Sequence, residues 1–97
     1  MDLKVRDNQD RKRFEARIDD YVVFIDYIRT TNLIYLTHTE VPSELEGQGI
    51  GSALVEQVLE KVRILGLSLA PLCPFVAGYI RKNPQWKSLV DHRYSVG

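Results

Sequence analysis

Three glycines stand within five residues, where Gly47, Gly49 and Gly51 enclose Gln48 and Ile50. Glycine weakens helices and strands, so this density indicates a backbone that needs positive φ angles or must let another group approach closely. The segment lies just before a helical pattern, and the free N–H groups and the dipole at a helix start attract anions. The glycines therefore predict a main-chain site for a ligand diphosphate. The alternative is a plain flexible turn.

Two familiar phosphate loops do not fit these glycines. The dinucleotide fingerprint G-x-G-x-x-G requires a third glycine where Ser52 or Leu54 stands. The P-loop requires a lysine followed by serine or threonine, and no lysine stands in this segment. The sequence therefore predicts a phosphate loop of another kind.

His38 and Glu40 are the side chains best suited to proton transfer. They stand two residues apart in a strand-like segment, which predicts that both lie on one face with their side chains about 7 Å apart. Either could accept a proton directly or through a water molecule. The alternative is a hydrogen-bonded strand histidine beside a solvated glutamate.

Cys73 follows a short apolar run and is the only cysteine of the chain. Its thiol could act as a nucleophile, activated by the start of a following helix or by His38. Cysteine is also a small apolar residue that is often buried, so a structural role is the alternative. A single cysteine excludes an internal disulfide and any zinc site that needs two or more cysteine ligands, and we expect no metal.

The segments that must position these residues begin with three predicted strands. Residues 14–18 alternate apolar and charged side chains, the pattern of a strand with one buried face. Residues 21–29 and 33–41 are rich in aromatic and β-branched side chains, and we expect 21–29 to be largely covered on both faces. Because two or three residues separate these segments, they predict an antiparallel meander joined by hairpins.

Helical periodicity replaces the strand pattern after the third strand. Apolar side chains recur at helical spacings as far as Gly66, which we expect to end the helix. Residues 67–72 predict a fourth strand, parallel to the third because a helix connects them. Residues 75–82 predict a second helix with Pro74 in its first turn, and 85–97 receive no assignment. The predicted fold class is α/β: an antiparallel meander, a crossover helix, a parallel fourth strand and a second helix.

Length and composition indicate one ordinary globular domain. The chain has 97 residues, of which 44% are hydrophobic and 27% charged. We expect a flexible arm over 1–12 and a single domain over 13–97. Thirteen basic and thirteen acidic residues leave no net charge, which disfavours nucleic acid as a partner.

No apolar run reaches the length of a membrane span, about 18 residues, and the start of the chain is polar. We therefore expect a cytoplasmic protein without membrane contact, either a monomer or a weak homodimer.

The run 41–51 carries Val41, Pro42 and the three glycines after a strand. In this it resembles the acetyl-CoA-binding segment of the GNAT N-acetyltransferase superfamily, written R/Q-x-x-G-x-G/A. The strings LTHTEVPSELEGQGIGSALV and APLCPFVAGYIRKNPQW are similar to its short stand-alone YjdJ-type branch. The resemblance covers 14–90 and implies a GNAT-like fold, acetyl-CoA as the cofactor and acetyl transfer to an amine. Glu46 departs from the pattern, because the family carries Arg or Gln there, and its charge would repel a diphosphate.

The resemblance also implies roles for individual residues. Thr39 and Val41 would offer free main-chain groups to pantetheine, opposite the strand that ends near Cys73. Tyr79 is similar in placement to the tyrosine that protonates the departing sulfur, and a core tyrosine is the alternative. The diphosphate would be held by Gly47, Gln48, Gly49, Ile50, Gly51 and Ser52. Arg81, Lys82 or Lys87 could meet the 3′-phosphate, and a solvated charged face is the alternative.

The predicted function is therefore acetyl-CoA binding and acetyl transfer to an unidentified amine, with His38 or Glu40 as the base. Full-length members carry extra N-terminal helices that build the acceptor pocket, and this sequence shows none. The acceptor site would then be shallow, supplied by a partner chain or missing. The alternatives are a non-catalytic CoA or acyl-CoA-binding module, acyl transfer through Cys73, and a plain interaction domain.

Overall fold

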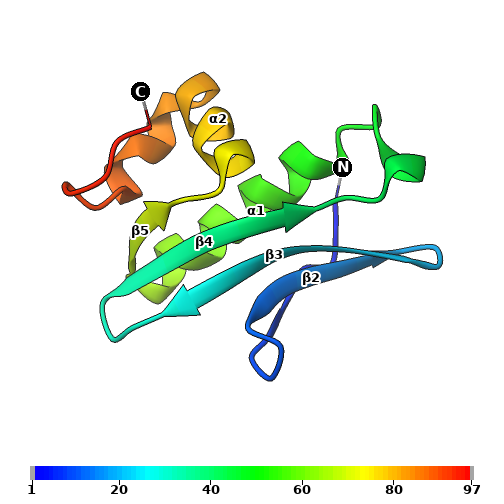
Figure 1. Ribbon diagram of the computed structural model, residues 1–97, viewed down its shortest axis with the longest axis horizontal. Coiled ribbons are helices and arrows are strands. Elements are labelled where there is room, and N and C mark those ends of the chain that lie inside the picture. Colours follow the sequence, from blue (N-terminus) through cyan, green and yellow to red (C-terminus); the bar gives the residue numbers. More distant parts are fainter. Residues whose placement is uncertain (1, 97) are drawn as a thin grey trace.

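The computed structural model describes residues 2–96 and consists of one five-stranded sheet with two α-helices and two 3-10 segments (Figure 1). Met1 and Gly97, which the predicted arm and domain include, lie outside the described residues. The strands are β1 (Arg6–Asn8), β2 (Arg13–Ile18), β3 (Tyr21–Arg29), β4 (Leu33–Glu40) and β5 (Ser68–Pro71). The helical segments are η1 (Ser43–Leu45), α1 (Ile50–Leu65), α2 (Pro74–Lys82) and η2 (Pro84–Leu89).

The strands stand in the sheet in chain order, with β1 to β4 antiparallel and β5 parallel to β4. This confirms the predicted α/β class, the meander, the crossover helix, the parallel strand and the second helix. A two-residue turn joins β2 to β3, and its Asp19 has a φ of 53°, a conformation that aspartate tolerates well. Helix α1 connects β4 to β5 and lets the two strands pair in parallel, so that their ends can frame a site.

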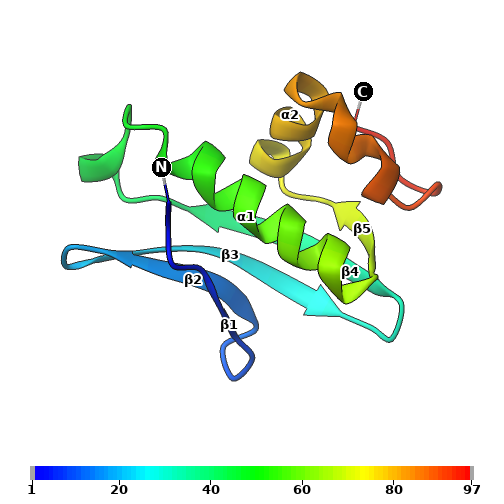
Figure 2. The same cartoon turned by 180° about the vertical axis from the view of Figure 1, so that it is seen from behind.

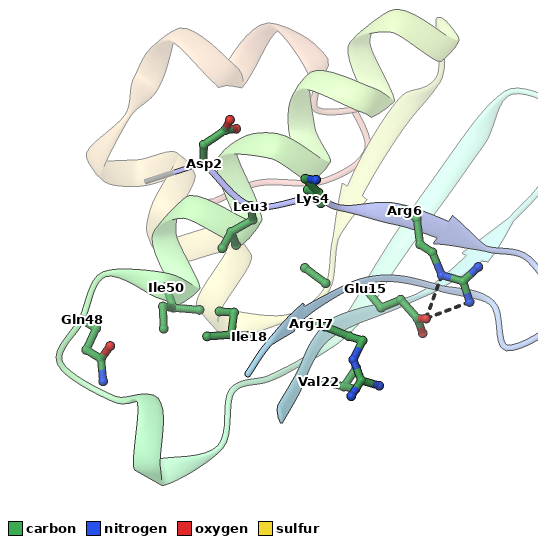
Figure 3. A pocket seen from close by; sticks show the side chains of 11 residues that line it. Asp2, Leu3, Lys4, Arg6, Glu15, Arg17, Ile18, Val22, Gln48 and Ile50 are labelled. Atoms are coloured by element: carbon green, nitrogen blue, oxygen red, sulfur yellow. Dashed lines mark hydrogen bonds and ion pairs between the residues drawn. The ribbon is translucent and has the colours of Figure 1, made fainter. Parts of the chain in front are cut away.

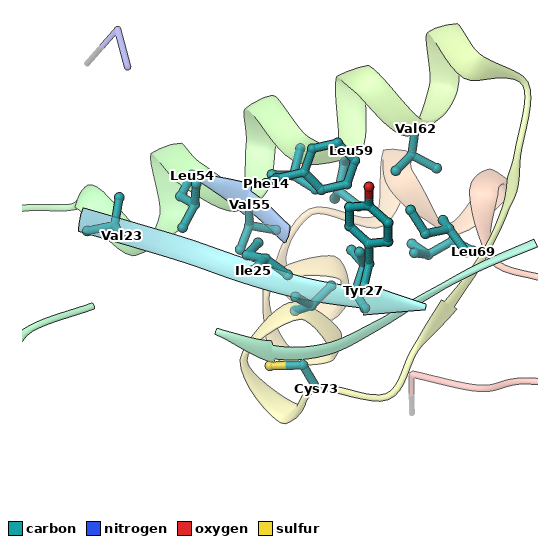
Figure 4. Packing of buried hydrophobic residues seen from close by; sticks show 14 of the residues in the cluster. Phe14, Val23, Ile25, Tyr27, Leu54, Val55, Leu59, Val62, Leu69 and Cys73 are labelled. Atoms are coloured by element: carbon teal, nitrogen blue, oxygen red, sulfur yellow. The ribbon is translucent and has the colours of Figure 1, made fainter. Parts of the chain in front are cut away.

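Helix α1 lies across one face of the sheet (Figure 2). Residues three and four apart share one side of a helix, so its apolar stripe packs onto the sheet as one surface. Gly66 ends the helix with a φ of 72°, and its N–H donates to the last carbonyls of α1. Figure 4 shows this packing, which includes Leu54, Val55, Leu59 and Val62 of α1 with Val23, Ile25 and Tyr27 of β3.

Only one face of β3 is fully buried, although its composition predicts cover on both. Val23 and Ile25 are buried against α1, whereas Phe24 and Asp26 on the other face are half-buried. The expectation of a doubly covered strand is therefore wrong, because α1 covers only one side of it. We call the other side the open face. In the middle of the sheet it carries Phe24, Asp26, His38 and Glu40.

Strand β1, near the start of the described chain, belongs to the sheet. β1 pairs with β2, and Leu3 is buried in the core. The Tyr27 hydroxyl donates to Asp7 at 2.6 Å, and burial together with this carboxylate raises the pKa of Tyr27 to about 12. Leu3 and residues 6–8, which the sequence assigns to a flexible arm over 1–12, are therefore held by the core and the sheet. A three-residue polar strand has no visible period of its own and forms only because β2 and Tyr27 supply its partners.

Glu15 on the open face joins two arginines, which should make the fold sensitive to acid. The Arg13 Nε donates to Glu15 at 2.7 Å and Arg6 pairs with it at 3.0 Å. The hydrogen bond from Arg13 is the main cause that lowers the pKa of Glu15 from 4.5 to about 2. Because the folded-state pKa is depressed, this stabilisation is present above pH 4.5 and is lost as pH falls toward 2. We expect Glu15→Gln to lower the free energy of unfolding by about 1 kcal/mol at pH 7 and by less in acid.

Urea unfolding of both proteins between about pH 7 and pH 3 measures this difference. Glu44→Gln is the matched control, because Glu44 is exposed and pairs with no arginine in the described part of the chain. A difference between native protein and E15Q that stays constant across the range would contradict the assignment to the carboxylate's charge.

Candidate functional site

The glycine segment forms a tight loop between η1 and α1. Gly47 has a φ of 80° and Gly49 a φ of 76°, in the left-handed region where residues with a Cβ atom are strained. Gly49 is the N-cap of α1, and among the described residues no side chain caps this end. The first N–H groups of a helix have no partner within it. The loop therefore presents free donors at the positive end of the helix dipole.

These donors open into a pocket of about 420 Å³, which we call the loop pocket. The end of β4 forms one wall, the glycine loop forms another, and Phe75 of α2 contributes to a third. The pocket brings together all the predicted cofactor-binding residues except Gln48. From that set it contains Thr39, Val41, Gly47, Gly49, Ile50, Gly51 and Ser52.

Gln48 lines a different and larger hollow of about 670 Å³, between the N-terminal segment, β2 and the start of α1 (Figure 3). Its lining mixes charged with apolar side chains, and Glu15 there is already paired with Arg6. Within residues 2–96, none of the three loop glycines lines this hollow. The loop pocket is therefore the better candidate site, because the uncapped end of α1 opens into it.

Strands β4 and β5 separate beside the loop pocket. Their pairing runs from Leu33 opposite Ser68 to Leu36 opposite Pro71, and the last link is the Cys73 N–H donating to the Leu36 carbonyl at 2.9 Å. Leu72 N–H turns back to the Ala70 carbonyl at 3.0 Å, a tight turn that bends the chain away from β4. In the described structure, β4 beyond Leu36 therefore has no β5 partner on this edge. An extended ligand chain could bind there.

Cys73 stands at this divergence. Its sulfur shares a hydrogen bond of 3.3 Å with the Thr39 hydroxyl, and the residue is 4% exposed. The structure thus brings Cys73 beside a predicted cofactor-binding residue, at the separation of the two parallel strands. Its burial favours a packing role over that of an open nucleophile.

His38 and Glu40 lie on the opposite side of β4 from the loop pocket. A register shift between Asp26 and Tyr27 leaves no β3 residue opposite Thr37, whose hydroxyl donates to the Asp26 carbonyl at 3.3 Å, so the side-chain alternation reverses at that point. His38 then pairs with Asp26 on the open face. Its Nε2 lies 2.9 Å from Glu40 Oε1, and both side chains are about half exposed. The strand therefore separates the two groups of predicted site residues, with the acid–base pair on one face and the cofactor wall on the other.

Tyr79 lies away from the loop pocket. It lines a hollow of about 600 Å³ between α1 and α2, which we call the helix pocket. Its hydroxyl donates to Glu56 at 3.2 Å, and burial, followed by the charge of Glu56, raises the pKa of Tyr79.

Of the three cations predicted to meet the 3′-phosphate, Lys82 lines the helix pocket, whereas Arg81 donates to the Val96 carbonyl at 2.7 Å. Lys87 lines neither the loop pocket nor the helix pocket.

Phe75 is a site residue that the sequence analysis missed. A Cβ atom placed on Gly51 would lie 2.7 Å from the Phe75 Cζ, so the ring tip rests on the bare backbone of α1. The third glycine of the loop therefore serves this contact, whereas Gly47 and Gly49 serve the positive φ angles. A glycine inside a first helical turn, where alanine would be more stable, is the signal that could have indicated a close neighbour.

Residues 2–96 contain no cluster of three or more His, Cys, Asp or Glu side chains that could hold a metal ion. Over the same residues, no helix has the length and apolar character needed to cross a membrane.

Comparison with known protein families gives a match over residues 13–89 to the family described as GCN5-related N-acetyl-transferase. The matched segment runs from the first residue of β2 to the last residue of η2. It includes the whole loop pocket, the His38–Glu40 pair and Cys73. The resemblance drawn from the sequence is thus confirmed for the family. The YjdJ-type branch stays a prediction.

Proposed function

The chain belongs to the GCN5-related N-acetyltransferase family, and on this premise we propose that it binds acetyl-CoA in the loop pocket and transfers the acetyl group to an amine. One observation above all supports this proposal. The uncapped start of α1 and the unpaired edge of β4 meet in a single pocket. A diphosphate needs the first feature, and a chain of amide groups such as pantetheine needs the second.

The donor set of the pocket suits the cofactor with one exception. Backbone N–H groups at the start of α1 would hold the diphosphate, and no acidic residue stands in the first turn of α1 as described. Main-chain groups of Thr39 and Val41 would hold the pantetheine arm. Glu46, however, lines the same pocket, and its charge would weaken the binding of an anion. When bound, acetyl-CoA supplies an acetyl group activated as a thioester.

On the other side of β4, the His38–Glu40 pair would handle the proton. His38 would accept the proton of the attacking amine, and Glu40 would hold the imidazole in place through the 2.9 Å contact. Main-chain N–H groups near Val41 would polarise the carbonyl that is attacked. CoA would leave as a thiolate, and the proton taken up by His38 would return to it through water. The diphosphate would occupy the loop pocket, and the thioester would reach the open face through the gap between β4 and β5 beyond Leu36, where the amine would approach it.

Acyl transfer through Cys73 is a second candidate, supported by the short contact with Thr39. Its thiolate would attack the thioester, release CoA and later pass the acetyl group to the amine. Intact mass after rapid mixing with acetyl-CoA separates the two routes. If the protein mass stays unmodified and Cys73→Ala keeps full activity, transfer through Cys73 is excluded and direct transfer to the amine remains.

A thermal-shift measurement with CoA, acetyl-CoA and NAD tests the proposed cofactor. A ligand that binds only the native state stabilises it by about 2.7 kcal/mol at a hundred times its Kd. For a domain of this size, that corresponds to a rise in melting temperature of about 10 °C or more. We expect this rise with CoA and acetyl-CoA and none with NAD. The absence of any rise with CoA species would overturn the proposal, and a rise without turnover on any amine would favour the binding module.

A further inference from the structure

We propose that Phe75 is the platform on which the adenine ring of the cofactor stacks, and that the adenosine end therefore lies in the helix pocket. This inference rests on the proposed function. It concerns a residue of α2 that lies outside the glycine loop and outside β4. The ring of Phe75 contacts the backbone at Gly51, is partly exposed, and lies between the loop pocket and the helix pocket.

The ring of Phe75 contacts α1 at Gly51 through the end of the ring that is farthest from its backbone. The three ring atoms that approach the Gly51 position most closely are Cζ and the two Cε atoms, at 2.7, 3.1 and 3.7 Å from an added Cβ. Contact through the tip fixes the ring against α1 while it leaves the ring faces uncovered by this helix. The side chain is 46% exposed, which is unusual for phenylalanine in a domain with a well-filled core.

The same ring stands between two hollows. Phe75 and Ser52 line both the loop pocket and the helix pocket, and the other residues of the two pockets differ. A ligand that reaches from one hollow into the other must pass this side chain. The helix pocket lies between α1 and α2, with Glu56, Tyr79 and Lys82 further along its walls.

The order of the chemical groups in CoA indicates which way the molecule would run through the two pockets. In CoA, the diphosphate joins pantetheine on one side to adenosine on the other. If the amides at the start of α1 hold the diphosphate and the edge of β4 holds pantetheine, adenosine leaves on the side away from β4. Phe75 borders the loop pocket, and the helix pocket that begins beside it is lined by residues of α1, α2 and Asn83, with no β4 residue among those described, so it is the hollow open to that end of the cofactor. Every base has a π-face, so an exposed aromatic ring is a suitable partner for adenine.

Lys82 would complete this end of the site. It lines the helix pocket, and its ammonium could meet the 3′-phosphate of the ribose. Arg81, one residue earlier, is held by the Val96 carbonyl. The two ends of the helix pocket would thus recognise two features that distinguish CoA from phosphopantetheine, namely the base and the extra phosphate.

Titration calorimetry with CoA and with 4′-phosphopantetheine tests the platform. Phe75→Leu keeps apolar bulk and removes the aromatic faces, so we expect a loss of about tenfold in affinity for CoA. Phosphopantetheine has no adenine, and its affinity should change by less than about twofold. Phe75→Tyr retains the ring and should bind CoA like the native protein. Equal CoA affinity for F75L and the native protein, or an equal loss for both ligands, would overturn the inference.

Dephospho-CoA, which lacks the 3′-phosphate, tests the lysine independently. Lys82→Gln should weaken CoA and leave dephospho-CoA unchanged. Lys61→Gln is the matched control, because Lys61 lies on α1 and lines neither pocket. An equal change for both ligands in K82Q would contradict a phosphate contact. Native protein that binds none of these ligands would instead refute the proposed function itself.

Discussion

Replacing Gly49 by valine is expected to abolish the rise in melting temperature that acetyl-CoA gives to the native protein. Gly49 has a φ of 76°, and a residue with a Cβ atom costs about 1–2 kcal/mol in that conformation. A Cβ there meets no atom within 4 Å, so the substitution disturbs the loop backbone rather than the packing. As the loop relaxes, the amides at the start of α1 turn away from their common point and the diphosphate site is lost. A thermal-shift titration with acetyl-CoA measures this result.

Gly66→Val is the matched control for this experiment. Gly66 stands at the other end of α1, with a φ of 72° and open space around its Cβ position. The same residue type therefore introduces the same strain without touching the loop pocket. We expect both variants to melt below the native protein and only G66V to keep the rise with acetyl-CoA. If G49V kept its rise as well, the loop amides would not hold the cofactor.

Replacing His38 by alanine is expected to lower kcat for amine acetylation by about a hundredfold, with the KM for acetyl-CoA unchanged. A positioned general base contributes about a hundredfold to ten-thousandfold to a rate, and His38 lies across β4 from the loop pocket. Removing it should therefore affect proton transfer and spare cofactor binding. Steady-state assays that vary each substrate separate the two effects.

Two further measurements sharpen the test of His38. Added imidazole should restore part of the activity of H38A, because it replaces the missing base. If His38 had only a structural role, added imidazole would not restore activity. His92→Ala is the control, since the chain has two histidines and His92 is exposed beside Asp91 and lines neither the loop pocket nor the helix pocket. Full activity of H38A would show that His38 does not take the proton.

Much of the fold follows from the sequence, because the signals that specify it are local. Alternation over 14–18 and the helical spacing that ends at Gly66 depend only on neighbouring residues, and both appear in β2 and α1. The two-residue gap after Ile18 leaves the chain no connection other than a hairpin. The glycine loop is local too, since its unusual density is visible without knowing what surrounds it.

The arrangement of the candidate site was decided by contacts between distant segments. Strict alternation along residues 33–41 would place His38 on the same face as Leu36, and only the register shift against β3 moves it to the open face. The contact of Phe75 with Gly51 joins α2 to α1, and the hydrogen bond between Tyr79 and Glu56 holds that tyrosine in the helix pocket. Periodicity states which residues share a face of one element. Which faces meet depends on pairing and packing between elements, and only the folded chain brings these together.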